Sequence, residues 1–315
     1  MEYKVIDGKG IIPDGTTEIE KSAFKGCTSL QSIEIPDSVT EIGDEAFGDC
    51  PNLQSIEIPD SVTRINHSAF SGCNNLTSIT VSKNNPKYKS INNCILTKDG
   101  KILILCRNHN IPDSVTIIGD FAFKGYTSLQ SIEIPDSVTT IGWAAFWDCA
   151  GLQSIVIPDS VTMIDRSAFW GCNNLTSIIV SKNNPKYEST DNCILTKGGK
   201  ELVLCRSHNI PDGVTTIGSA AFDGCTSFQS IVIPDSVTSI DRDAFSSCSG
   251  LQSITITTQE KEPDMSRERI EYLLQALSEY SKEFFLRVPI GCGYAYRHHP
   301  AFEGKFQKVI GDIDA

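Results

Sequence analysis

Cysteine and histidine recur together at two places in the sequence, and these residue types bind metals or form disulfides. The two sets, 99 residues apart, are Cys94, Cys106, His109 and Cys193, Cys205, His208. Two thiolates and an imidazole suit Zn²⁺, but a structural zinc site needs four ligands and no fourth is evident. Each cysteine pair also flanks a predicted hairpin turn, where facing positions suit a disulfide. We predict no metal at either set, and buried thiols and a disulfide remain alternatives.

Catalytic motifs are missing from the rest of the sequence. It contains no glycine-rich phosphate loop, no H-E-x-x-H, no G-x-S-x-G and no C-x-x-C. No nucleophile and base, and no pair of carboxylates, stands out from the pattern described below. We therefore expect a protein that is not an enzyme and that needs no cofactor.

A repeat organises most of the chain. The tripeptide Ile-Pro-Asp occurs eight times, at steps of 23 residues interrupted by two steps of 53. Each long step holds 30 extra residues, which places hairpin insertions near 82–110 and 181–209. Self-similarity at this period is typical of a solenoid, in which each unit packs only against its neighbours. Residues 1–256 are therefore predicted to form one solenoid of eight 23-residue units.

One unit, residues 53–73, shows what each position does. Leu53, Ile56 and Ile58 follow an L-x-x-I-x-I pattern whose end alternates as a half-buried strand does. Pro59-Asp60 then ends the strand in a turn. An Ala-Phe pair follows in every unit, so the phenylalanines should stack as a spine inside the coil. These are Phe24, Phe47, Phe70, Phe123, Phe146, Phe169, Phe222 and Phe245.

Seven of the twelve cysteines recur at one position of the repeat, shortly after the Ala-Phe pair. A cysteine that returns with the period behaves as a small buried apolar residue. We expect these seven to be reduced core thiols. They are Cys27, Cys50, Cys73, Cys149, Cys172, Cys225 and Cys248.

The consensus unit, I-P-D-S-V-T-x-I-G-x-x-A-F-x-G-C-x-x-L-x-S-I-x-I, resembles the BspA-like class of leucine-rich repeats, the type also found in Treponema. Asn85-Pro86-x-Tyr88 and Lys98-Asp99-Gly100 are similar to that family's hairpin. The resemblance implies an α/β solenoid: a right-handed superhelix with a parallel β-sheet on the concave face and turns or helical turns outside. It also implies a cell-surface or secreted protein that binds host or bacterial partners without catalysis.

Residues 257–315 depart from the repeat and are predicted to form a C-terminal capping segment. Asp264 or Ser266 can cap a helix there. Ile270, Leu273, Leu274, Leu277 and Tyr280 share one face at helical spacing. Such an amphipathic helix would cover the exposed end of the solenoid core.

The three tryptophans fall in neighbouring units and give the first candidate binding surface. Trp147 and Trp170 are 23 residues apart, at a position that elsewhere holds Lys, Asp, Ser or Gly and therefore faces solvent. Trp143 and Phe121 lie nearby in the sequence. Clustered exposed aromatic residues are typical of a protein or glycan contact. The alternative is that the rings pack against the insertion hairpins.

A second candidate surface lies between the two isoleucines of the strand pattern, where side chains point out of the sheet. This column is acidic or polar in the first units and becomes mostly apolar from the fifth unit on, at Val156, Ile179 and Val232. Single exposed apolar residues on strands are also ordinary.

Charge and hydropathy limit the classes of partner that we expect the protein to bind. The formal net charge is −12, which argues against nucleic acid. No apolar run approaches the length of a membrane span. The start of the chain lacks the features of a signal peptide, so the protein would be cytoplasmic if Met1 is the native start. We expect a non-catalytic adhesion-type scaffold that binds a protein at the host or bacterial surface, with a carbohydrate ligand as the alternative.

Overall fold

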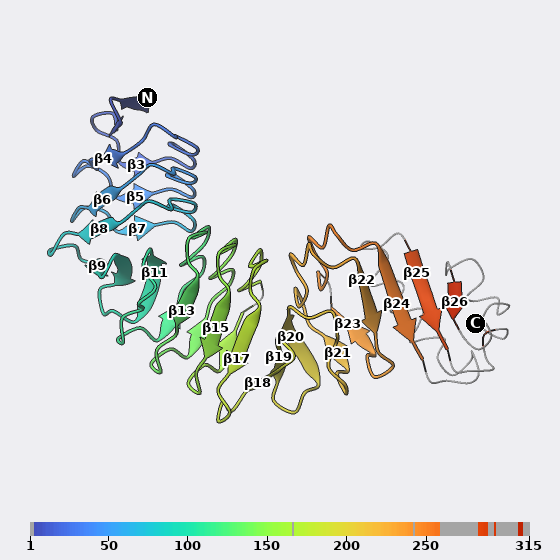
Figure 1. The fold of residues 1–315 in the computed structure, drawn as a ribbon. Coiled ribbons are helices and arrows are strands. Elements are labelled where there is room, and N and C mark those ends of the chain that lie inside the picture. The colour runs from blue at the N-terminus through green and yellow to red at the C-terminus, as the bar shows by residue number, and fades with distance from the viewer. Residues whose placement is uncertain are drawn as a thin grey trace. The chain divides into compact units, whose positions relative to one another are not determined.

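The computed structural model describes residues 3–165, 167–241, 243–258, 283–288, 293 and 308–310. The chain divides into two compact units. The first contains residues 1–177 and 181–185, and the second contains residues 178–180 and 186–315. Each is built from short strands and turns that repeat along the chain as the coils of a solenoid (Figure 1). The predicted repeat solenoid is confirmed.

The L-x-x-I-x-I segments form the first row of strands. Equivalent isoleucines are paired in register, as Ile33 with Ile56 and Ile56 with Ile79, so each apolar side chain packs on its counterpart in the next coil. Apart from the antiparallel pair β1–β2, these strands are parallel. Along the first unit the row contains β1 (Lys4–Ile6), β2 (Lys9–Ile11), β4 (Ser32–Ile33), β6 (Ser55–Ile58), β8 (Ser78–Val81), β13 (Ser131–Glu133) and β15 (Ser154–Ile157). The boundary between the two units falls within β17 (Ser177–Val180).

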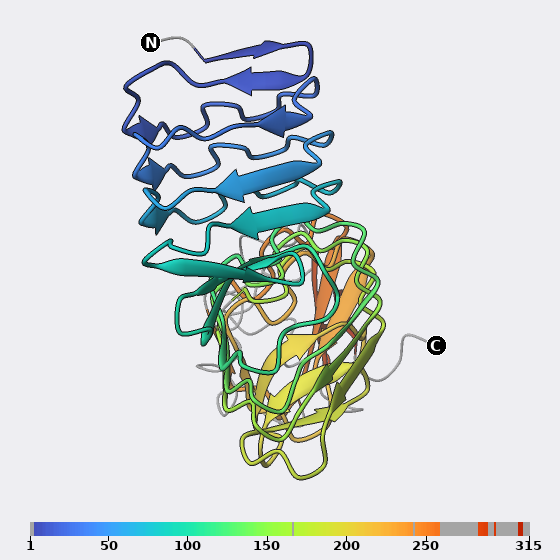
Figure 2. The same cartoon turned by 90° about the vertical axis from the view of Figure 1, so that its left-hand side faces the viewer.

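A second row of parallel strands runs beside the first and was not predicted from the sequence. It forms where repeats two to eight read Val-Thr-x-Ile and the first reads Thr-Thr-Glu-Ile, and each of these strands has only two residues. Figure 1 shows this row beside the first, and Figure 2 shows the coils of the first three repeats, in blue to cyan, stacked one above another. Its members in the first unit are β3 (Glu18–Ile19), β5 (Glu41–Ile42), β7 (Arg64–Ile65), β12 (Ile117–Ile118), β14 (Thr140–Ile141) and β16 (Met163–Ile164).

The first insertion folds as an antiparallel meander of β9 (Tyr88–Ile91), β10 (Cys94–Thr97) and β11 (Ile102–Cys106). Its last strand pairs in parallel with β12 and so contributes one coil to the second row. The Cys106 amide donates to the Ala122 carbonyl at 3.0 Å, as the Phe47 amide donates to the Ala69 carbonyl at 2.8 Å. Cys106 therefore takes the place that a phenylalanine holds in the other coils.

The second unit repeats this plan. Its insertion contains β18 (Tyr187–Thr190), β19 (Cys193–Thr196) and β20 (Glu201–Cys205), and its second row continues with β21 (Thr216–Ile217) and β23 (Ser239–Ile240). The first row contains β22 (Ser230–Ile233), β24 (Ser253–Thr257), β25 (Glu283–Arg287) and β26 (Lys308–Ile310), all parallel. The predicted C-terminal segment thus adds two strands to the solenoid sheet. The predicted capping helix, with its stripe from Ile270 to Tyr280, lies outside the described residues.

The phenylalanine spine is confirmed. Successive rings are nearly parallel, with centroids 5.5 Å and 5.2 Å apart from Phe24 to Phe70. They are 4.9 Å and 5.4 Å apart from Phe123 to Phe169, and 4.9 Å from Phe222 to Phe245. Every ring of the spine is buried. The rings form one stack within each block of repeats, and the insertions separate the blocks.

The outer side of the solenoid corrects the predicted α/β class. No helix is assigned in residues 3–165, 167–241 and 243–258, where turns follow the second row of strands. Each outer turn has a residue with a left-handed backbone two positions before the phenylalanine, for example Ser68 at φ 60°. L-residues in this conformation interrupt a right-handed helix, so a helix cannot continue through the turn. Within the described part of the chain, no helix combines the length and apolarity that a bilayer span requires.

Candidate functional site

The structure brings together the four aromatic residues predicted to form a binding surface. The Phe121 ring centroid lies 4.8 Å from that of Trp143 and 6.0 Å from that of Trp147. Trp147 in turn contacts Trp170 edge-on, at an interplanar angle of 90°. We call Phe121, Trp143, Trp147 and Trp170 the aromatic cluster. Trp147 and Trp170, which are equivalent positions of consecutive repeats, meet at a right angle, unlike the parallel phenylalanines of the spine.

The aromatic cluster stands on the outer turns of three consecutive repeats. Phe121 follows β12, Trp143 and Trp147 follow β14, and Trp170 follows β16. Trp143 is 44% exposed, whereas Trp147, Trp170 and Phe121 are half-buried. The residues around the tryptophan rings come from segments 44–74 and 120–170, not from the insertion at 82–110, whereas Phe121 also shares a pocket with Ile102 and Ile104 of β11. The cluster is therefore open to solvent on one side.

Repeats two and three supply the facing wall, which sequence reasoning missed. Glu45, Asp49 and His67 lie on this wall, and the His67 ring centroid is 5.7 Å from that of Phe121. Two contacts join the wall to the fourth repeat. The Thr127 amide donates to Asn74 Oδ1 at 3.0 Å, and Lys124 approaches both Glu45 and Ser68. These residues are 50 or more positions apart in the sequence, so no local pattern could have paired them.

Lys124 sits at the centre of the site. Its Nζ lies 5.1 Å from the Phe121 ring centroid and 5.0 Å from the Trp147 ring centroid. The same atom is 3.7 Å from Glu45 Oε1 and 3.3 Å from Ser68 Oγ. An ammonium group is attracted to the negative face of an aromatic ring. The aromatic cluster is thus already shown to accommodate a cation.

Three neighbouring pockets lie between the aromatic cluster and the facing wall, and adjacent pockets share lining residues. The first part, a cavity of about 300 Å³ that we call the apolar cavity, is lined by the aliphatic residues of β7, β11 and β12 and by Phe121, and also by polar residues of the adjacent turns, namely Asn66, His67, Ser68, Ser71 and Asp120. A middle part is lined by His67, Phe121, Trp143 and Trp147, and shares His67 and Phe121 with the cavity. An acidic end is lined by Asp49, Asp148, Trp147 and Trp170, and shares Trp147 and Lys124 with the middle part. We call the whole the junction groove.

Asp49 and Asp148 give the acidic end its character. Both are exposed, and neither forms an ion pair with a cation in the described residues. The pKa of Asp148 is raised, mainly because its carboxyl is partly withdrawn from water; the Lys124 ammonium opposes this effect and the Asp49 carboxylate adds to it. Both residues have a φ of 55°, at a turn position that is glycine in most other repeats. At both positions an aspartate stands in place of glycine, although glycine adopts a positive φ at a lower energetic cost.

Phe121 also occupies a left-handed position, with φ 59°. The equivalent residues in the other repeats are serine, alanine, aspartate or glutamate. A bulky aromatic residue is unusual in this conformation, and strained residues of this kind cluster at functional sites. Its counterpart 99 residues later, Ala220, has φ 61° and no ring. The ring of Phe121 is therefore not a requirement of the repeat.

The second predicted surface faces solvent, and its residues are not among those that line the junction groove. Val156, Ile179 and Val232 are 47%, 52% and 43% exposed on the first row of strands. None of them lines the groove. The structure groups Phe121 with the tryptophans and leaves the valine and isoleucine column separate.

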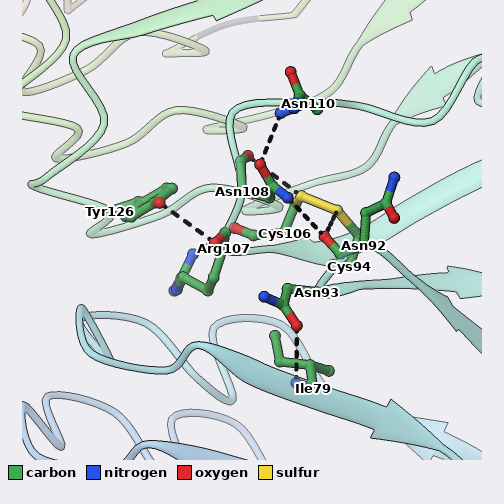
Figure 3. The surroundings of a disulfide bond; sticks show 9 residues. All are labelled: Ile79, Asn92, Asn93, Cys94, Cys106, Arg107, Asn108, Asn110 and Tyr126. Carbon is green, nitrogen blue, oxygen red and sulfur yellow. Dashed lines mark hydrogen bonds between the residues drawn. A yellow bond between two sulfur atoms is a disulfide. The ribbon is translucent and has the colours of Figure 1, made fainter.

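The structure resolves the alternatives for the insertion cysteines in favour of disulfides. Cys94 is bonded to Cys106 and Cys193 to Cys205, each pair facing across its hairpin and fully buried. Figure 3 shows the first disulfide among the loops of the insertion, where Asn93 Oδ1 accepts a hydrogen bond from the Ile79 amide at 3.4 Å. Because Cys106 occupies a phenylalanine position, this disulfide fills the core between two blocks of the spine.

Arg107, next to this disulfide, is a buried residue that sequence reasoning missed. Its guanidinium donates to the carbonyls of Phe70 at 2.7 Å, Lys124 at 3.1 Å and Cys106 at 3.1 Å. Burial lowers the pKa of Arg107. Its own carbonyl accepts a hydrogen bond from Tyr126, which stands where other repeats have cysteine (Figure 3). Arg107 thus ties the third repeat to the fourth through the Phe70 and Lys124 carbonyls.

Elemental analysis is expected to find no stoichiometric zinc in protein purified without chelator. The disulfides leave no thiolate at either cysteine pair, and both His109 and His208 are exposed. Within the described residues, no three histidine, cysteine or acidic side chains gather as metal ligands. Two zinc ions per chain would contradict this prediction.

The seven cysteines of the repeat position are reduced thiols, as predicted. Burial raises the pKa of Cys50 to about 12 and that of Cys73 to about 11, so both stay protonated at neutral pH. Cys225 differs, since its pKa is lowered by hydrogen bonds from the Cys248 thiol and from the Arg206 guanidinium, the latter at 3.1 Å. Cys27 is only half-buried, so the prediction of a core thiol is wrong there; the others, except Cys225, act as apolar core residues.

Sequence comparison identifies the family. The description "BspA type leucine rich repeat region" matches residues 9–99, 105–197 and 202–265, in six copies. The chain belongs to the BspA-type leucine-rich repeat family. This confirms the resemblance seen in the repeat unit, and the matched segments include every residue of the junction groove except those of β11 before Leu105. No curated protein matches the sequence.

Several solved structures of leucine-rich repeat proteins are similar to this BspA-type chain. One is a leucine-rich cell surface protein from Faecalibacterium prausnitzii, with 25% identity over 94% of this chain and 83% of that one, at a TM-score of 0.49. A protein from Eubacterium ventriosum shares 21% identity over 79% and 74% of the two chains, at 0.46. A Treponema pallidum protein shares 21% over 79% and 87%, at 0.32.

Proposed function

We propose that this BspA-type protein is a non-catalytic, adhesion-type scaffold that binds another protein through the junction groove. One observation carries the proposal. Phe121, Trp143, Trp147 and Trp170 converge on a single groove and face a wall supplied by other repeats. The repeat needs none of these rings, because other repeats have small or polar residues at the same positions.

Aromatic side chains in such a setting are the usual anchors of protein interfaces. Tryptophan, tyrosine and arginine dominate the binding energy where they are partly enclosed and can be fully desolvated by a partner. Trp147 and Trp170 are held edge to face, and Trp143 projects beside them with 44% of its surface exposed. A partner that covered the cluster would bury preformed rings and order few side chains on binding.

A location at the cell surface or in secreted form agrees with the disulfides. Both Cys94–Cys106 and Cys193–Cys205 are disulfides whose four cysteines are buried in the core. Disulfides persist in oxidising compartments and are rare in the cytosol. The partner proposed here is accordingly a protein of the host or bacterial surface.

Replacing Trp147 and Trp170 together by serine is expected to abolish most binding with little loss of stability. Serine stands at this position in other repeats, as Ser71 and Ser246, so the turn accepts it. Truncating an anchor costs about 2 kcal/mol or more, which is roughly a 30-fold loss of affinity. Peptides selected on the wild-type protein from a displayed random library would be measured by calorimetry on both proteins.

The matched control changes the other candidate surface, with Val156→Ala and Val232→Ala. These side chains are as exposed as Trp143 but lie outside the groove. The control variant should bind the selected peptides with unchanged affinity. If the valine variant loses binding while the tryptophan variant keeps it, the interface lies on the strand face and the proposal is wrong.

A carbohydrate ligand is the second candidate, because Asp49 and Asp148 flank Trp147 and Trp170. Carboxylates can accept hydrogen bonds from sugar hydroxyls next to an aromatic ring. A glycan array probed with wild type and with the Trp147→Ser, Trp170→Ser variant separates the two candidates. Glycan signals that depend on the tryptophans, with no peptide enriched from the library, would favour the carbohydrate ligand.

A further inference from the structure

The junction groove has an apolar and an acidic part joined by aromatic rings, and this order limits what can fill it. The apolar cavity exists because β7 is the last strand of its sheet and does not pair with β11, the next strand of the second row. Side chains from β7, β11, β12 and the following turn therefore enclose about 300 Å³ between Phe70 and Phe121. This is the lower limit for ligand pockets, which run from about 300 to 1,000 Å³. It suits one branched aliphatic side chain.

The acidic end selects for positive charge. Glu45 is neutralised by Lys25 at 2.6 Å and Lys124 at 3.7 Å, and these contacts lower the pKa of Glu45. Asp49 and Asp148 have no such partner in the described residues and remain exposed beside Trp147 and Trp170. A cation placed there would meet two carboxylates and an aromatic face together. The net charge of −12 attracts a basic partner from a distance as well.

The arrangement of the tryptophans favours a side chain over a sugar ring. Trp147 and Trp170 meet at 90°, so they form a corner and present no flat platform of two rings. Lys124 already places its ammonium group over Trp147 and Phe121. A lysine or arginine from a partner can use the Trp170 side of the same corner, within reach of Asp148.

We infer that the junction groove recognises an extended peptide segment of a partner protein, with an aliphatic side chain in the apolar cavity and a lysine or arginine at the acidic end. Phe121 joins the two subsites because its ring lines both the cavity and the middle part. The inference rests on the proposed function, since it names the kind of partner that the same groove binds.

The test uses the peptides selected on the full-length wild-type protein. Their sequences should be enriched in an aliphatic residue at a constant spacing from a lysine or arginine. The variant Asp49→Asn, Asp148→Asn should bind the best peptide about 10-fold or more weakly, because charge-assisted hydrogen bonds are lost. Replacing the basic residue of the peptide by norleucine should then cause no further loss, and raising the salt concentration should weaken only the wild-type complex.

Two controls keep this result specific. The variant Asp37→Asn, Asp136→Asn removes the same charge from exposed Ile-Pro-Asp turns that do not line the groove, and should bind normally. Phe121→Ala copies Ala220, whose backbone has the same conformation. The losses of affinity caused by Phe121→Ala and by truncating the aliphatic peptide residue to alanine should not add up, because both changes remove the same contact.

The outcomes separate the inference from the proposed function. Peptides that bind through Trp147 and Trp170 but show no basic enrichment and no loss with Asp49→Asn, Asp148→Asn would overturn the inference and leave the proposed function standing. If no peptide is enriched on the wild-type protein, both fail.

Discussion

Replacing Phe146 by alanine is expected to lower the free energy of unfolding by about 3–5 kcal/mol, the usual cost of truncating a large core aromatic residue. Phe146 is fully buried and stacks between Phe123 and Phe169, at centroid distances of 4.9 Å and 5.4 Å. The cavity would interrupt the spine in the middle of the second block, and repeats on both sides would lose a packing partner.

Urea unfolding followed by circular dichroism measures this loss. The matched control is Phe121→Ala, which removes the same side chain from a half-buried position outside the spine and relieves a left-handed backbone of a bulky residue. We expect it to change stability by less than about 1.5 kcal/mol. Equal losses for the two variants would show that the phenylalanine column does not form the core of the solenoid.

The variant Arg107→Met is expected to cost about 3 kcal/mol, because it removes three hydrogen bonds to carbonyl groups, of which that of Phe70 keeps the Cys73 amide as a donor at 3.3 Å. The guanidinium satisfies the carbonyls of Phe70, Lys124 and Cys106, and Arg107 is only 5% exposed. Each buried acceptor that loses its donor costs about 1–3 kcal/mol. Methionine keeps the length and apolar volume of the arginine side chain, so the effect isolates the hydrogen bonds.

Arg64→Met provides the comparison for Arg107. The Arg64 side chain is 68% exposed and lies 3.5 Å from Glu41, and exposed ion pairs of this kind contribute between about 0 and 1 kcal/mol. Both variants would be unfolded in urea under the same conditions. A small loss for Arg107→Met, similar to that for Arg64→Met, would mean that Arg107 does not hold the third and fourth repeats together.

The repeat made the core predictable from the sequence. Because Ile56, Phe70 and Cys73 recur at constant spacing, their burial in a stacked coil follows from the period alone. The second row of strands was missed for a physical reason. Two-residue strands such as β7 are too short to show the alternation by which a strand is recognised in a sequence.

The insertions were harder to predict, because their role depends on contacts between distant segments. Nothing local indicates that Cys106 completes the phenylalanine column or that Arg107 reaches the Phe70 carbonyl. One signal was available: Tyr126 replaces the cysteine of the repeat at the coil that follows the insertion. Its hydroxyl donates to the Arg107 carbonyl at 3.3 Å, so the exception marks the junction.

The aromatic residues of the candidate site were predicted from the sequence, but the wall that faces them was not. Phe121, Trp143, Trp147 and Trp170 stood out because they break the repeat, and the structure places them together. The facing wall of Glu45, Asp49 and His67 could not be inferred, because the insertion sets how one block of repeats meets the next. The aspartates at glycine positions, Asp49 and Asp148, were the overlooked clue.

Tryptophan fluorescence tests the central claim most directly. The chain has three tryptophans, and all of them line the junction groove, so their emission reports on this site alone. Titrating a selected peptide that lacks tryptophan should shift the emission to shorter wavelength and protect it from acrylamide, with the same Kd that calorimetry gives. Binding detected by calorimetry without any change in tryptophan emission or quenching would place the partner elsewhere and contradict the account.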